Sequence, residues 1–115
     1  MTATLNLPPI EKYSTFRHRL IWKGANQQPI DLTGCSAKLQ LRKNVGDTVL
    51  LELSTTNNRI LLGGVDGTID LIIAKADTAD LAFKNAKYDL LITMANGEAI
   101  RLCEGIASIH DGITQ

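Results

Sequence analysis

Apolar and polar residues alternate along most of this chain, in short runs separated by turn-forming residues. In residues 14–22, Phe16 and Leu20 fall on one side of the run, while Arg17 and Arg19 fall on the other. Successive side chains of a strand point to opposite faces, so this alternation predicts a β-strand with one buried face. Comparable short runs predict further strands at residues 30–32, 37–42, 49–53, 60–62, 68–73, 88–94 and 100–106.

The segments between the runs have turn composition. Asn96 and Gly97 form the strongest short signal for a hairpin, so the runs on either side of them are expected to pair. The three glycines of residues 63–67 can adopt positive φ, which predicts a loop there. Gly105 lies inside the last run, where a glycine predicts a β-bulge.

Residues 75–83 are the one helical candidate, in which Asp77 or Thr78 would cap a single turn. Seven or eight short strands with this one helical turn predict an all-β fold, either an antiparallel β-sandwich or a small barrel. No segment between the strands is long enough for a crossover helix, which disfavours a parallel α/β domain. Trp22 ends the first alternating run and is expected to anchor the core.

The chain has 115 residues, which suits one domain. Residues 1–12 contain Pro8 and Pro9 and show no periodicity, so we expect an extended arm that either frays or docks on a neighbouring subunit. Residues 13–110 are predicted to form a single β-sandwich domain, followed by a tail at residues 111–115.

Composition and charge narrow the set of partners. The 12 basic and 12 acidic residues give a formal net charge of zero, so no net field attracts the chain to nucleic acid or to an anionic membrane. We therefore expect neither as a partner. The sequence has no apolar run long enough for a membrane helix and begins without the pattern of a cleaved signal peptide, so synthesis in the cytoplasm is expected.

The histidines and nearby hydroxyls do not form a convincing catalytic set. Ser108, His110 and Asp111 are close in sequence, but on a strand Asp111 would face away from the other two. His18 lies on the apolar side of its run, with no candidate nucleophile beside it. The sequence therefore predicts no catalytic residues and no small-molecule substrate.

The cysteines indicate packing and not chemistry. Cys35 and Cys103 belong to no CxxC pair, which fits two buried thiols in a reducing compartment and leaves a single disulfide between them open. The two histidines and two cysteines lack the paired spacing of a zinc site. Asp66 and Asp70 lack the regular ligand positions of a calcium loop. We expect no metal and no cofactor.

The order of several short motifs resembles that of small structural proteins of tailed bacteriophages and prophages. The motifs are PIDLTG at 29–34, an alternating strand that ends in Arg42, GTIDL at 67–71, TADL at 78–81, YDL at 88–90, an Asn-Gly turn and RLCEG at 101–105. The pattern is similar to the immunoglobulin-like N-terminal domain of phage baseplate upper proteins and to related collar and tail accessory proteins. It covers nearly the whole chain after residue 13.

The resemblance implies an immunoglobulin-like sandwich and a non-enzymatic virion component. Such a protein would act at the collar, neck, tail or baseplate, or as a fibre adaptor, by binding other phage structural proteins and further copies of itself in a ring. A capsid decoration protein is an alternative, and a small carbohydrate-binding sandwich module is an alternative of another class. The residues expected to make protein contacts are Leu5, Leu7, Pro8, Pro9, Ile10, Arg17 and Arg19.

Overall fold

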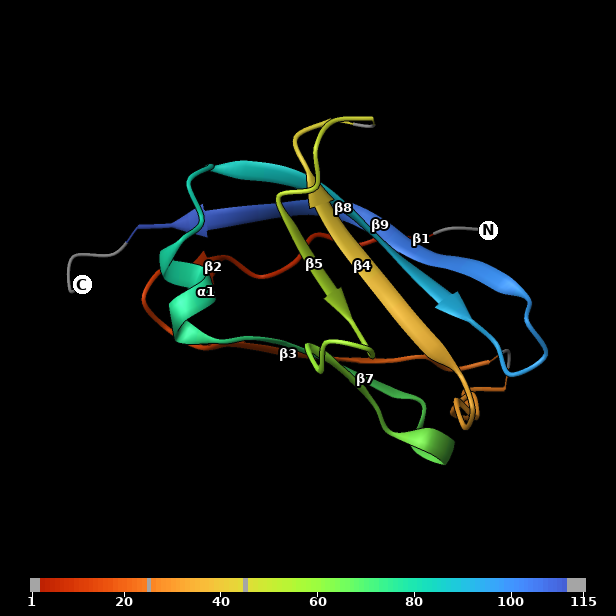
Figure 1. Cartoon of the computed structure of the whole chain (residues 1–115). Coiled ribbons are helices and arrows are strands. Elements are labelled where there is room, and N and C mark those ends of the chain that lie inside the picture. The colour runs from red at the N-terminus through yellow and green to blue at the C-terminus, as the bar shows by residue number, and fades with distance from the viewer. Residues whose placement is uncertain (1–2, 25, 45, 112–115) are drawn as a thin grey trace.

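The computed structural model describes residues 3–24, 26–44 and 46–111, which form two β-sheets (Figure 1). The larger sheet has the order β1-β9-β8-β4-β5, and β2 also pairs with β9. Its strands are β1 (Ala3–Thr4), β2 (Ile10–Glu11), β4 (Ser36–Arg42), β5 (Leu51–Ser54), β8 (Asn85–Thr93) and β9 (Ala99–His110). The smaller sheet has the order β3-β7-β6, with β3 (Phe16–Ile21), β6 (Ile60–Leu62) and β7 (Thr68–Ile73).

This strand order confirms the all-β, immunoglobulin-like sandwich. In that fold the second, fifth and fourth main strands form one sheet, and the seventh, sixth and third form the other. Here β3, β7 and β6 take the first set of places, and β9, β8 and β4 take the second, with β5 added beside β4. The pairs among these seven strands are antiparallel, whereas β1 and β2 run parallel to β9 and raise the number of described strands above the predicted seven or eight.

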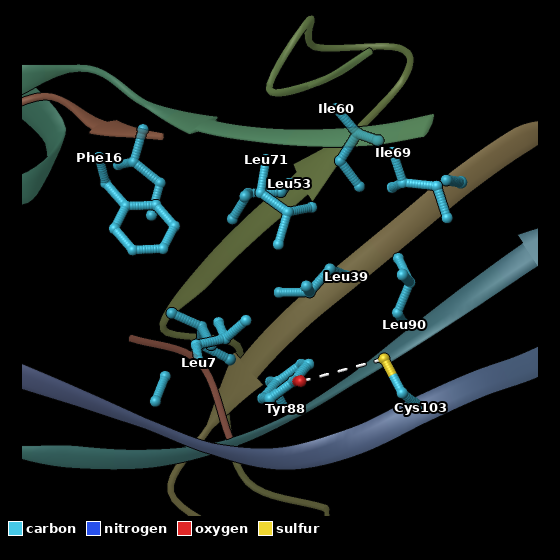
Figure 2. Packing of buried hydrophobic residues seen from close by; sticks show 14 of the residues in the cluster. Leu7, Phe16, Leu39, Leu53, Ile60, Ile69, Leu71, Tyr88, Leu90 and Cys103 are labelled. Carbon is cyan, nitrogen blue, oxygen red and sulfur yellow. Dashed lines mark hydrogen bonds between the residues drawn. The ribbon is translucent and has the colours of Figure 1, made fainter. Parts of the chain in front are cut away.

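The core lies between the two sheets and is built from their alternating inner faces (Figure 2). The smaller sheet contributes Ile69 and Leu71, and the larger sheet contributes Leu39 and Leu90, all with at most 1% of their surface exposed. Trp22 is half-buried and packs against this cluster, as predicted. Burial of such side chains is the main force that holds the two layers together.

Residues 30–32 are not a strand, contrary to the prediction. Leu32 is buried, but the backbone there turns between the two sheets, and Asp31 closes the turn. Its Oδ1 accepts hydrogen bonds from Thr33 N at 2.9 Å and from Thr33 Oγ1 at 2.6 Å. These bonds hold the pKa of Asp31 below its ordinary value. Local side-chain bonding of this kind competes with strand pairing.

The predicted hairpin of β8 and β9 is confirmed, but its bulge is at a different residue. Leu90 pairs with Cys103 and Leu91 pairs with Arg101, which leaves Leu102 as the extra residue. Gly105 pairs regularly and is not the bulge. One extra residue reverses the phase of a strand, so Ile106, expected on the inner face, is 49% exposed.

The helical turn is also confirmed, as α1 (Lys75–Ala79), but neither predicted residue caps it. Its N-cap is Ala74, which makes no side-chain capping bond. Thr78 is fully buried instead, and its hydroxyl donates to the carbonyl oxygen of Ser14 at 2.8 Å. α1 is thus tied to the chain that leads into β3. A short 3₁₀ turn, Gly64–Asp66, occupies the predicted glycine loop.

Candidate interaction surfaces

The N-terminal segment, residues 3–11, is part of the sandwich and not an arm outside it. Beyond its two short ladders with β9, Leu5 N donates to Glu104 O at 2.7 Å and Leu7 N donates to Ile106 O at 3.1 Å. Figure 1 shows the segment running alongside β9. The predicted domain boundary at residue 13 is therefore corrected, since described residues from 3 onward belong to the domain. The predicted tail lies mostly outside the described residues.

Two of the predicted contact residues belong to the protein's own core. Leu7 is 7% exposed and Ile10 is fully buried, so neither is available to a neighbour while the segment is in place. Pro8, Pro9 and Leu5 are exposed and remain candidates. Pro8 and Pro9 lie between Leu7 and Ile10 and interrupt the alternation, so the sequence pattern does not predict that Leu7 and Ile10 are buried in the core.

A notch in β9 receives the N-terminal segment at Leu5. A Cβ atom at Gly105 would overlap the carbonyl oxygen of Leu5 and lie 2.7 Å from its carbonyl carbon, so only glycine leaves room for this crossing. The hydroxyl of Tyr88, inside the core, donates a hydrogen bond to the same carbonyl oxygen. Burial, together with the neighbouring Cys103 thiol, raises the pKa of Tyr88 (Figure 2). We call this notch and the adjoining buried positions of Leu7 and Ile10 the segment slot.

The first strand of the smaller sheet has an open edge. Among the described strands, β3 pairs only with β7. Trp22 N donates to Gly67 O, the residue opposite it in the register, so by antiparallel alternation Arg17, Arg19 and Ile21 direct their backbone N–H and C=O groups away from β7. We call this row the β3 edge. It offers hydrogen-bonding groups that another strand can pair with.

The predicted arginines lie at this edge with their side chains in solvent. Arg19 makes a bidentate pair with Asp70 of β7, with Nε–Oδ1 at 2.7 Å and Nη2–Oδ2 at 3.1 Å. Hydrogen bonding to Arg19 holds the pKa of Asp70 below its ordinary value, although partial burial opposes the shift. Within the described residues no hydrogen bond or ion pair is formed by the exposed Arg17 side chain, although its charge also helps to lower the pKa of Asp70.

The outer face of the larger sheet carries an open groove of about 870 Å³, which the sequence reading did not single out. Its charged lining is Lys38, Arg42, Lys87 and Arg101 with Asp89 and Glu104. Arg101 Nε lies 2.8 Å from Asp89 Oδ2. No buried side-chain nitrogen or oxygen in the described part of the chain lacks a hydrogen-bond partner.

The structure gives the partners of the two cysteines and of His110. Cys35 and Cys103 are both free thiols, and burial raises the pKa of Cys103. His110 Nδ1 lies 2.6 Å from Glu11 Oε2, so its described partner is neither Ser108 nor Asp111. Across residues 3–24, 26–44 and 46–111 there is no cluster of three metal-ligating side chains. In those same ranges no helix is long and apolar enough to cross a membrane.

Comparison with known proteins does not identify a family. No family model matches the sequence, and no curated protein matches it. Among solved structures, the chain is similar to extracellular domains 3–5 of Drosophila OTK, with a TM-score of 0.41 and 15% sequence identity. The match covers 98% of this chain but 35% of that chain. A likeness at this level carries no argument about kinship or function.

Proposed function

We propose that the chain is a non-enzymatic structural subunit of a tailed-phage virion, in the collar, neck, tail or baseplate, that assembles through protein–protein contacts. It would be made in the host cytoplasm and reside in the virion. The phage assignment rests on the order of sequence motifs, from PIDLTG to RLCEG. The structural observation that supports an assembly role is the open β3 edge. Addition of a strand to such an edge is a common way for sheet proteins to bind one another.

The side chains of the β3 edge restrict which strand can pair there. Two β3 strands related by a twofold axis would bring arginines opposite each other, which is unfavourable. A different strand, with a carboxylate placed to meet Arg17, is the better partner. A contact between two different surfaces repeats around a ring or along a helical stack, which agrees with the ring that the resemblance implies.

The alternatives differ in how far the molecule supports them. A capsid decoration protein would use the same β3 edge, so only location in the particle separates it from a tail component. A carbohydrate-binding module would stack sugars on exposed aromatic rings. The chain has five aromatic side chains of the Phe, Trp and Tyr types, and none of them falls in the exposed class. We therefore do not favour a carbohydrate-binding function.

Proline substitution at the β3 edge tests the proposal. Proline removes a backbone N–H, so Arg17→Pro should abolish edge pairing while the ladder with β7 stays intact. His18→Pro is the matched control, because His18 N–H faces β7 and its loss should unfold the smaller sheet. The readouts are thermal unfolding, light scattering after chromatography, and electron microscopy of the recombinant protein and of purified particles. A strictly monomeric protein that is absent from virions would refute the proposal.

A further inference from the structure

We propose that the N-terminal segment is exchanged between copies in the assembly, so that residues 3–11 of one copy occupy the segment slot of the next. The proposal deepens the function proposed above, on which it rests, by naming a second contact between subunits, in addition to the β3 edge. It commits to one occupant, the same segment of a second copy of this chain. The β3 edge is then left for a different strand.

The segment slot recognises the segment specifically, whichever copy supplies it. Leu7 and Ile10 fill buried positions, and Gly105 leaves space for the Leu5 carbonyl that Tyr88 binds. All of these contacts join residues 3–11 to β8, β9 and the core. None of them depends on the covalent link between the segment and β3, so a second chain can make the same set.

The link between the segment and β3 is short and strained, which favours exchange. The segment ends at Glu11 and β3 begins at Phe16, and the intervening turn is closed by a hydrogen bond from Ser14 N to Glu11 O at 3.3 Å. Tyr13 in this turn has φ of 67°, a left-handed conformation that is unfavourable for a residue with a side chain. Opening the turn into an extended hinge relieves that strain, and short strained hinges promote domain swapping.

The position of the segment also allows one copy to replace another without breaking the ladder between β8 and β9. The segment lies at the outer edge of the larger sheet, so β9 keeps its full ladder with β8 when the segment departs. Pro8 and Pro9 are exposed in the middle of the segment and keep it extended when it is free. An extended strand loses less conformational entropy on entering a second copy than a flexible one does.

A cysteine pair distinguishes exchange from the closed form. Glu11 and His110 are register partners across β2 and β9, and their side chains are in contact, so Glu11→Cys with His110→Cys can form a disulfide. The pair is introduced into the full chain with the native thiols removed by Cys35→Ser and Cys103→Ala. The assembled protein is then oxidised and analysed by denaturing electrophoresis without reductant.

Exchange predicts a ladder of covalent multimers, whereas the closed form gives only monomers with an internal disulfide. Asn85→Cys with Ser108→Cys is the matched control, because it joins β8 to β9 within one chain and must give monomers in either case. Oligomers that yield only monomeric bands would overturn exchange and leave the proposed function standing. Multimeric bands from a protein that is absent from virions would support exchange and overturn the proposed function. A protein that stays monomeric at every concentration would overturn exchange, and if it were also absent from virions it would overturn the proposed function as well.

Tyr13→Gly provides a second, independent readout. Glycine accepts the left-handed conformation without strain, so the closed turn is stabilised relative to the open hinge. The covalent multimers formed by the Glu11 and His110 cysteine pair should fall by roughly fivefold, given the usual cost of this conformation. An unchanged or increased yield of multimers would mean that strain at Tyr13 does not drive exchange.

Discussion

Gly105→Ala is the substitution that tests most directly how the N-terminal segment is held. The added methyl group would overlap the Leu5 carbonyl, so the segment must move away from β9. That movement breaks the hydrogen bonds donated by Leu5 N, by Leu7 N and by the Tyr88 hydroxyl to the Leu5 carbonyl, each contributing about 1 kcal/mol. It also exposes Leu7, whose burial is worth about 2 kcal/mol. Replacing glycine by alanine restricts the unfolded chain, which stabilises the fold by about 0.5 kcal/mol. Because Ile10 can keep its own contacts and local adjustment offsets part of the loss, we expect a net destabilisation of about 4 kcal/mol.

The assay is urea unfolding followed by circular dichroism, with Gly24→Ala as the matched control. Gly24 also lacks positive φ. A Cβ there would lie 3.2 Å from the end of the flexible Ile30 side chain and at an ordinary contact distance of 3.8 Å from Gln28 O, so the control should change stability little. Leu7→Ala should destabilise the Gly105→Ala protein much less than it destabilises the wild type, because the segment that carries Leu7 is already displaced. Two results together would refute this account of the segment slot. Gly105→Ala would leave the protein as stable as the wild type, and Leu7→Ala would destabilise the Gly105→Ala protein as much as it destabilises the wild type.

Three further predictions concern single side chains. The pKa of Tyr88 is raised, so the unfolded chain loses the phenol proton first and stability should fall as pH rises above about 10. Tyr88→Phe should weaken that alkaline loss and cost about 1 kcal/mol at neutral pH in urea unfolding, by removing the bond to Leu5. Thr78→Val should destabilise by about 1–3 kcal/mol, whereas Thr78→Ser, which keeps the buried hydroxyl, should cost less. The pKa of Asp70 is lowered by Arg19, so its contribution is complete above pH 4 or so and is lost at lower pH; Asp70→Asn should flatten that part of the stability curve.

The alternation of apolar and polar residues predicts most strands of the sandwich, because it reflects the local geometry of a strand. The runs at 60–62 and 68–73 coincide with β6 and β7, and the run at 37–42 differs from β4 by one residue. Alternation also assigned Phe16 to the core and Arg17 to solvent, as the structure shows. These positions depend on which face of a strand is buried, a property that the strand's own residues encode.

The sequence does not predict that the N-terminal segment belongs to the sandwich, because the segment pairs with a strand that lies about 100 residues further along the chain. Two prolines interrupt the segment, so Leu7 and Ile10 show no strand period, and only pairing with β9 makes them core. The bulge at Leu102 was missed for a related reason. No glycine or proline marks it, and it arises from fitting β9 against β8. Pairing over long distances in sequence is what local patterns do not report.

The candidate site was predictable only in part. The exposure of Arg17 and Arg19 followed from alternation, but the open edge beside them did not. The order in which strands pair decides which strand lies at the edge of a sheet. Here the N-terminal segment pairs with β9 and not with β3, so β3 remains at the edge. In an immunoglobulin sandwich the first strand can cover that edge. No strand of the described residues takes this position, so β3 is left as an edge strand there.

Residue-resolved amide hydrogen exchange, measured before and after assembly, tests most directly whether the β3 edge is the contact. In the isolated protein the amides of Arg17, Arg19 and Ile21 should exchange quickly, while those of His18 and Leu20 are protected by β7. In the assembled protein the first three amides should become protected, and the other two should change little. If the three edge amides exchange equally fast in both states, strand addition at β3 does not hold the assembly together, and the central claim is wrong.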